Sequence, residues 1–360
     1  MRNIVRHRLF WPVVTLAALL ALNVIVEHDF FAIRLQDGHL FGSVIDILRN
    51  GAPTLLVALG MTLVIATRGI DLSVGAIVAI CGALACSMIA ASPTPGSVGT
   101  VLIAVGAALV LAIVLGLWNG LLVSVLGIQP IIATLILMTA GRGLAMLITE
   151  GQIITVSSAP YKVIGGGYWL TMPASILIAG VMFALTALLT RKTALGILIE
   201  SVGINPEASR LAGVRSRSIL WTVYIFSAFC AGVAGLMISS NVTAADANNA
   251  GLWIELDAIL AVVLGGTSLA GGRYSLIGTL IGAFVIQTLT TTVYTVGIAP
   301  EITLVFKALV VIAVCLLQSP AMQARVRNAR RRRALQKQGT DAAGAPAVSP
   351  ASLTNEGAAS

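Results

Sequence analysis

The sequence predicts an all-α polytopic membrane protein with about ten transmembrane helices, built as pseudo-repeated halves with broken helices. Composition gives two of the observations behind this class. Of the 360 residues, 58% are hydrophobic and only 10% are charged, whereas an ordinary soluble protein carries roughly 25% charged residues. The third observation is that the apolar runs are long and continuous. An outer-membrane barrel would show short alternating segments instead.

Runs poor in charge place the expected spans, because a helix needs about 20 mostly apolar residues to cross a bilayer. They cover residues 9–26, 50–67, 72–92, 99–126, 130–149, 171–190, 218–240, 257–271, 274–296 and 302–318. The first run is expected to be a retained span, since no small-residue cleavage pattern follows it. The spans define a transmembrane domain over 1–318. A tail over 319–360, basic and then disordered, is expected to follow it in the cytoplasm.

Basic residues indicate the orientation of the chain. They cluster near the N-terminus, in 191–217 and in 325–337. Positive charge is retained on the cytoplasmic side, and ten crossings from an inside start place all three clusters there. We therefore expect both termini in the cytoplasm of a bacterium, with the chain in its inner membrane and residues 241–256 among the outer connections. The net charge of +8 fits this arrangement, and nucleic-acid binding is not expected.

A polar segment between two apolar runs, RKTALGILIESVGINPEASRLAGVRSR (191–217), predicts a short exposed helix. Asn205 is a good helix cap and Pro206 suits the first turn. Glu207 favours the positive helix start, and Gly213 is a natural stop. A capped surface helix between two spans is typical of a docking element, which an energy-coupled importer needs and a channel does not.

Two stretches of the chain are similar in sequence: LLVALGMTLVIATRGIDLSVGAIVAICGA (55–83) and ILAVVLGGTSLAGGRYSLIGTLIGAFVIQ (259–287). In both stretches an apolar run meets a glycine-rich break, so that Gly69 and Ser73 fall opposite Gly271 and Ser275. Interrupted spans at matching places indicate a translocation path. The alternative is that the glycines only allow close helix packing. A charged residue at each break favours the path.

Asp71 is the sharpest candidate site, because an acid beside long apolar runs must be paired, capped or in contact with water. It is expected either to cap the helix that follows, through amides at 72–74, or to face the solute, with Arg68 or Arg273 as its partner. Singly, the other intramembrane polar groups suit interhelical hydrogen bonds. As a set they suit the route of a neutral polyhydroxy solute. The predicted route residues are Asp71, Ser73, Asn119, Gln129, Thr134, Thr267, Ser268 and Gln287.

Catalytic and cofactor motifs are not found in the sequence. The three histidines form no cluster, and there is no GxxxxGK[ST] phosphate loop. ATP and magnesium are therefore expected on a separate ATPase, with no cofactor or metal in this chain and no enzyme activity. The cysteines have no metal-type or oxidoreductase spacing and are expected to pack in the membrane; they are Cys81, Cys86, Cys230 and Cys315.

Several motifs together resemble the permease subunits of ribose-type ABC importers, over about Leu40 to Gln318. They are GMTLVIATRGIDLSVGA, NGLLVSVLGIQPIIATLILMTAGRGLA, RKTALG, ESVGINPEASRLAGV and AVVLGGTSLAGGRYSLIGTLIGA. Within that family, the stretches 35–48 and 245–266 resemble permeases for galactofuranose. The chain departs from the family at Arg68, where glycine is usual.

The resemblance implies partners and roles. A cytoplasmic two-domain ATPase, a periplasmic sugar-binding protein and a second permease, identical or related, are expected beside the lipid bilayer. The predicted ATPase-coupling residues are Glu200, Gly203, Asn205, Glu207 and Gly213. The expected function is import of a neutral monosaccharide in furanose form, such as galactofuranose.

Two alternatives to this function stay open. One is a permease for ribose, xylose or another small polyol. The other is an ion-coupled secondary transporter, which should bury several ionisable groups near mid-membrane. In the sequence, Asp71 is the only clear candidate for such a group.

Overall fold

The computed structural model describes residues 9–36, 38–297 and 302–318. The chain divides into two units, Met1–Val311 and Ile312–Ser360. Of the second unit, the described part is the end of helix α13 (Thr303–Gln318). The tail predicted over 319–360 and the basic N-terminal residues 1–8 lie outside the described residues.

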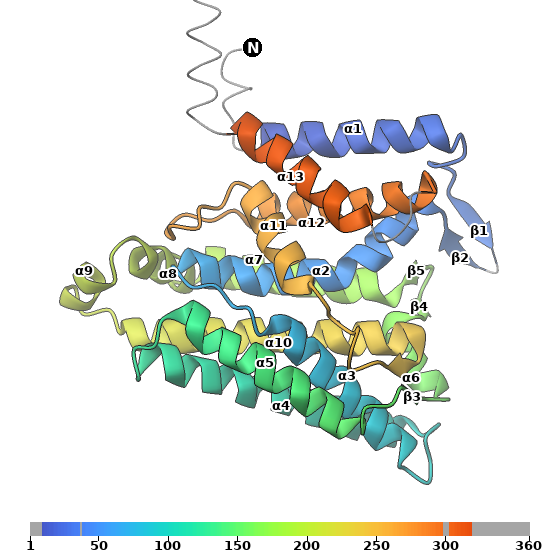
Figure 1. The fold of residues 1–360 in the computed structure, drawn as a ribbon, viewed down its shortest axis with the longest axis horizontal. Helices are drawn as coiled ribbons and strands as arrows, with labels where there is room; N and C mark the ends of the chain where they lie inside the picture. Colours follow the sequence, from blue (N-terminus) through green and yellow to red (C-terminus); the bar gives the residue numbers. More distant parts are fainter. Residues whose placement is uncertain (1–8, 37, 298–301, 319–360) are drawn as a thin grey trace, which may run out of the picture. The chain divides into compact units, whose positions relative to one another are not determined.

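A helix forms at each of the ten apolar runs, which confirms a predominantly helical membrane protein (Figure 1). The helices are α1 (Phe10–Val26), α2 (Ser43–Ala66), α3 (Val74–Ala90), α4 (Val98–Ser124), α5 (Pro130–Ile148), α7 (Ala174–Lys192), α10 (Ser216–Val242), α11 (Ile254–Leu264), α12 (Leu276–Thr295) and α13. Among the described residues, six helices are long and apolar enough to cross a membrane: α2, α4, α5, α7, α10 and α12. The count of about ten crossings stays a prediction.

Short elements fill the connections. Three antiparallel strand pairs form, and they join β1 (Arg34–Gln36) to β2 (His39–Phe41), β3 (Ile154–Thr155) to β6 (Ala244–Ala245), and β4 (Tyr168–Trp169) to β5 (Met172–Pro173). The short helices are α6 (Ala159–Gly165), α8 (Leu195–Ile204) and α9 (Pro206–Leu211). The β3–β6 pair fixes the chain just after α10, at the beginning of the connection to α11.

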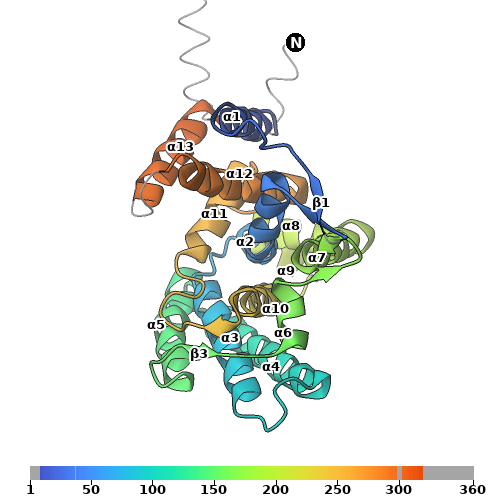
Figure 2. The same ribbon diagram turned by 90° about the vertical axis from the view of Figure 1, so that its right-hand side faces the viewer.

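Helix α10 is the centre of the core in Met1–Val311. It packs against α2, α3 and α4, which surround it in the end-on view (Figure 2). Small residues make these contacts close, as is usual between membrane helices. A Cβ on Gly60 of α2 would lie 2.7 Å from the Cα of Ser227, and one on Gly235 would overlap the Val78 carbonyl of α3.

A second group of helices packs on the other side of α2. Helix α12 contacts α2, and both α11 and α1 pack against α12. Polar contacts reinforce this group: Asn23 donates to Thr292 Oγ1 over 2.7 Å, and Lys307 Nζ lies 2.8 Å from Asp257 Oδ2. The Lys307–Asp257 pair is largely buried, so α13 is tied to α11 by charge as well as by apolar packing.

Candidate functional site

The connection from α2 to α3, residues 67–73, is called the first break. Asp71 lies in it with no exposed surface. Its Oδ1 accepts from the Ser73 amide (3.1 Å) and hydroxyl (2.6 Å), and its Oδ2 accepts from Ser227 Oγ (2.8 Å). Asp71 therefore binds one amide at the start of α3 and joins that start to α10.

Asp71 forms no ion pair among the described residues. The Arg68 guanidinium instead donates to the Ile204 carbonyl at the end of α8. A charge-paired Asp71, one of the two arrangements expected from sequence, is therefore not what the structure shows.

Polar side chains from two further helices meet the first break. Asn119 of α4 donates to Ser73 Oγ over 2.8 Å. Thr134 of α5 donates to the Ile70 carbonyl over 3.1 Å. Like Asp71, these three side chains have no exposed surface. Three of the eight residues predicted for the route, Asp71, Ser73 and Asn119, thus form one buried network at the start of α3. A fourth, Thr134, binds the backbone of the same break.

The other four predicted route residues lie elsewhere. Gln129 is exposed just before α5, and Gln287 is half-buried on α12, where it packs near Gly51. Thr267 and Ser268 belong to residues 265–275, called the second break, between α11 and α12. Thr267 is buried and accepts from the Ser275 amide over 3.3 Å, whereas Ser268 is exposed. The eight residues do not gather in one place.

Residues 243–253, between α10 and α11, form a re-entrant segment. A Cβ on Gly75 would lie 2.6 Å from the Gly251 carbonyl, so this segment reaches the first turn of α3. The position of Gly75 along α10 follows from its neighbours in sequence. Asp71 binds Ser227 and Val78 packs on Gly235, so Gly75 lies between the levels of Ser227 and Gly235. These two residues are about 17 and 28 Å along a helix about 40 Å long. The segment therefore runs from the end of α10 back to the level of its middle.

Sequence reasoning placed this segment in an outer connection, 241–256, and a span at 257–271. The structure begins α11 at Ile254, level with the middle of α10, and ends it at Leu264. The difference arises because β6 pairs with β3 and Gly251 contacts Gly75, two long-range contacts that no local pattern shows.

Arg142 of α5 holds the re-entrant segment in place. Its Nη1 donates to the carbonyls of Ala247 (3.0 Å) and Ala250 (2.7 Å). Within the segment, Asp246 accepts from the amides of Asn248 and Asn249 over 3.0 and 3.2 Å. Asn248, Asn249 and Trp253 are exposed. The structure thus places polar, non-helical backbone on an accessible surface, level with the middle of α10.

Glu255, in the first turn of α11, is 3% exposed and lies against Gly75 at the start of α3. The sequence identified Arg142 as an intramembrane polar group without giving it a place in the predicted route, and it placed Glu255 within the outer connection 241–256. The available signal was the run DANNAG (246–251), which is poor in helix formers, before an apolar run of only 15 residues, 257–271. The burial of Glu255 and Lys307 also shows that Asp71 is not alone among buried ionisable groups.

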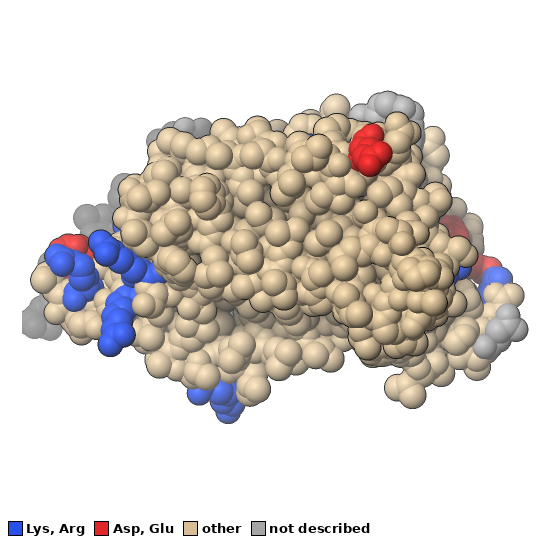
Figure 3. Space-filling view, turned by 90° about the horizontal axis from the view of Figure 1, so that it is seen from below, with Lys and Arg blue, Asp and Glu red and all other residues tan. Residues whose placement is uncertain are grey.

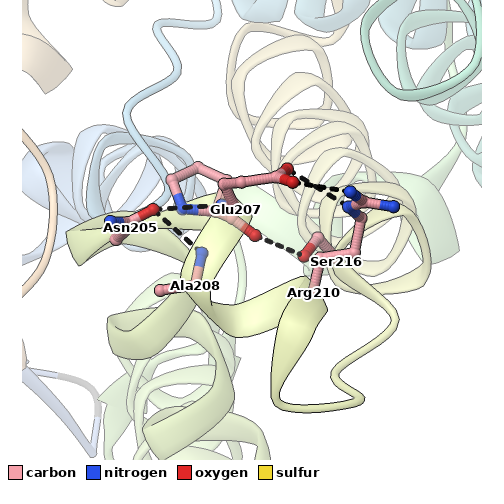
Figure 4. A network of polar contacts seen from close by, with 6 residues as sticks. Asn205, Glu207, Ala208, Arg210 and Ser216 are labelled. Carbon is pink, nitrogen blue, oxygen red and sulfur yellow. Dashed lines mark hydrogen bonds and ion pairs between the residues drawn. The ribbon is translucent and has the colours of Figure 1, made fainter.

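The coupling segment, 191–217, contains the last residues of α7, the helices α8 and α9, and the first residues of α10. Figure 4 shows the polar contacts around α9. Asn205 Oδ1 accepts from the amides of Glu207 (3.1 Å) and Ala208 (3.0 Å), and Pro206 is the first residue of α9. Glu207 pairs with Arg210, whose guanidinium lowers the pKa of the Glu207 carboxyl. Gly213 follows α9 with φ +85°. The predicted cap and stop therefore form at the predicted residues.

The surface around α9 combines charge with exposed apolar side chains. Figure 3 shows Lys and Arg gathered at the end of the molecule where α9 lies, while the broad centre of this face is without charge. Ile197, Ile204 and Leu211 are 72%, 59% and 79% exposed. Such a mixture is typical of a surface that a protein partner covers.

Gly203 is buried and Glu200 is half-buried, whereas the other three predicted coupling residues, Asn205, Glu207 and Gly213, are exposed. A Cβ there would overlap the Ala66 carbonyl and lie 2.7 Å from the Gly272 amide. Glu200, one turn earlier, lines a cavity of about 250 Å³ together with Arg191 and Tyr274. These two predicted coupling residues thus face the second break rather than solvent alone.

Metal chemistry finds no support in the described part of the chain, where no cluster of His, Cys, Asp or Glu could hold an ion. The three cysteines whose side chains are described, Cys81, Cys86 and Cys230, are buried and free. The architecture is that of a membrane transport component: broken helices around a mid-depth junction, with a capped helix exposed at one end.

Comparison with known proteins identifies the family. Residues 43–315 match the family described as the branched-chain amino acid transport system / permease component, and the chain belongs to it. It is a permease subunit, a transport component rather than an enzyme. Membership implies a separate ATPase, a periplasmic binding protein and a multi-pass location in the inner membrane.

Three relatives show the range within the family. The chain is 48% identical to a galactofuranose transporter permease protein of Escherichia coli, over 91% of this chain and 96% of the relative. It is 42% identical to a fructose import permease protein of Bifidobacterium longum, over 94% and 95%. It is 34% identical to a ribose import permease protein of Haemophilus influenzae, over 88% and 93%. No solved structure matches the chain significantly.

Proposed function

We propose that this permease imports a neutral sugar in furanose form, galactofuranose or a close analogue, across the bacterial inner membrane. The relatives named for galactofuranose, fructose and ribose support a sugar, and the 48% identity favours the first. The re-entrant segment carries the proposal of a transport route. Non-helical backbone at membrane depth is tolerated only where it is buried in protein or lines a water-filled cavity.

The route follows the re-entrant segment and the junction where α3 and α11 begin. Helices that start at mid-depth are a recurrent feature of transporter binding sites. Each start here has one buried carboxylate, Asp71 for α3 and Glu255 for α11, which opposes the positive end of the helix dipole. The compensated junction suits a neutral solute better than an anion. Asn248, Asn249 and Trp253 offer it amide groups and an aromatic face.

Of the predicted route residues, the sealed four position the start of α3 beside the route. These are Asp71, Ser73, Asn119 and Thr134. The other four predicted route residues lie away from the start of α3; they are Gln129, Thr267, Ser268 and Gln287. A second permease, identical or related, faces the exposed side of the re-entrant segment across the route in this proposal.

Energy enters through the coupling segment. The ATPase docks on α8 and α9 in the cytoplasm, and it alone binds ATP and magnesium. Both termini of the permease lie on the same side as the ATPase. The periplasmic binding protein delivers the sugar from the opposite side.

Reconstitution in proteoliposomes with the ATPase and binding protein tests this function. Uptake of labelled galactofuranose should require ATP and the binding protein, and should exceed uptake of ribose, fructose and xylose. Preference for ribose or fructose would overturn the assigned sugar and leave the class intact. Uptake driven by a proton or sodium gradient without ATP would overturn the class.

A further inference from the structure

Three separate parts of the chain meet at the inner end of α2. The Ala66 carbonyl, at the last residue of α2, accepts from the Gly272 amide of the second break over 2.8 Å. Gly203 of α8 packs against both groups so closely that only glycine fits. The coupling segment therefore touches the last residue of α2, next to the first break, and the second break at one point.

Arg68 lies at this point and contacts all three parts. It belongs to the first break, its Cγ lies where a Cβ on Gly271 of the second break would be, and its guanidinium donates to the Ile204 carbonyl. Ile204 is the last residue of α8, and Asn205, the next residue, caps α9. A cation at a helix C-terminus is favourable, because the last carbonyls there lack helical partners.

The backbone of Arg68 is strained. Its φ is +66°, in the left-handed region that favours glycine. Arginine at such a position persists when the surrounding contacts hold it there. Here the contact is the charge-assisted bond to Ile204, since the Arg68 side chain is otherwise exposed. Strain and bond together point to a role for the guanidinium beyond the loop itself.

We propose that Arg68 is a positioning residue that fastens the coupling segment to both breaks, so that movement of α9 displaces the start of α3 and the start of α12 together. This inference rests on the proposed docking of the ATPase at α9. Without the Arg68 side chain, α8 still packs through Gly203, but the coupling segment is held less firmly to the first break. Transport per ATP hydrolysed then falls, while the fold is retained.

Arg68→Gly is the direct test, because glycine adopts the same backbone conformation without strain and removes the whole side chain, both the guanidinium and the stem that packs against Gly271. The matched control is Leu170→Gly. Leu170 also has a positive φ, +58°, but is 92% exposed at the β4–β5 turn, away from the coupling segment. Both variants should insert and melt near the wild-type temperature, because the strain that they relieve offsets the greater freedom of glycine in the unfolded chain.

The measured quantity is sugar uptake per ATP hydrolysed in proteoliposomes. Arg68→Gly should lower it about tenfold, the effect of losing one charge-assisted hydrogen bond, and Leu170→Gly should leave it unchanged. Arg68→Lys should recover part of the loss, because an ammonium group can still donate to the Ile204 carbonyl. A wild-type ratio in Arg68→Gly overturns the proposal. If Arg68→Gly does not insert, Arg68→Ala replaces it, because alanine also lacks the donor. A wild-type ratio of uptake to ATP hydrolysed in Arg68→Ala overturns the proposal equally.

A cross-linking arm separates this inference from the docking on which it rests. A cysteine in the exposed face of α9, Ala208→Cys, should cross-link to the ATPase. If it does and Arg68→Gly transports normally per ATP, only the role of Arg68 is wrong. If it does not cross-link, the docking assignment in the proposed function is wrong, whatever Arg68 does.

Discussion

Helices α3 and α11 begin side by side at the same depth, yet their starts are built in opposite ways. The start of α3 is sealed: Asp71, Ser73 and Asn119 have no exposed surface and bind one another or α10. The start of α11 is approached by the exposed, polar re-entrant segment, which Arg142 holds from α5. The two helix starts therefore share a level but differ in exposure, and this difference distinguishes their roles. One start fixes the architecture, and the other borders the proposed route.

The largest expected effect is on stability, from Asp71→Ala. This change leaves the Ser73 amide and the Ser73 and Ser227 hydroxyls without their acceptor in a sealed site, which should cost about 3 kcal/mol or more. Asp71→Asn should cost less, because an amide oxygen still accepts from the Ser73 amide. Thermal unfolding of the purified variants in detergent measures both. Equal melting temperatures for wild type and Asp71→Ala would show that the α3 start is not sealed as described.

A smaller effect on stability, but a clear one on transport, is expected at the α11 start. Arg142→Met keeps the length of the side chain and removes both bonds to the Ala247 and Ala250 carbonyls. Uptake should fall roughly tenfold, as for loss of a charge-assisted bond, with a melting temperature near that of wild type. Arg142→Lys is the matched control and should retain much of the uptake. A large loss of stability with normal specific uptake would reverse the roles assigned to the two starts.

The sequence predicted those features that depend on neighbouring residues. Apolar length placed α10 at 218–240, against Ser216–Val242 in the structure. The Asn205 cap and the Gly213 stop follow from residues within one turn of α9. In each case the local pattern contains the physical cause, so helix positions and caps were within reach of the sequence.

Features that depend on distant contacts were not predicted. The depth of the re-entrant segment is set by β3, about 90 residues earlier in the chain, and by Gly75. The burial of Gly203 depends on Ala66, which precedes it, and on Gly272, which follows it. Each lies more than 60 residues away in the sequence. Asp71 was predicted as a site, but its partner Ser227 on α10 was not, because hydroxyls on a long apolar helix are common.

Thiol labelling at the two helix starts tests the central claim most directly. In a chain whose native cysteines are replaced, Asn248→Cys represents the open start and Ser73→Cys the sealed one. Both lie in connections beside mid-depth helix starts, so depth alone does not distinguish them. A membrane-impermeant maleimide should label Asn248→Cys in right-side-out vesicles and leave Ser73→Cys unlabelled until the protein is denatured. Labelling of Ser73→Cys with protection of Asn248→Cys would contradict the account, because the accessible route would then pass the start of α3.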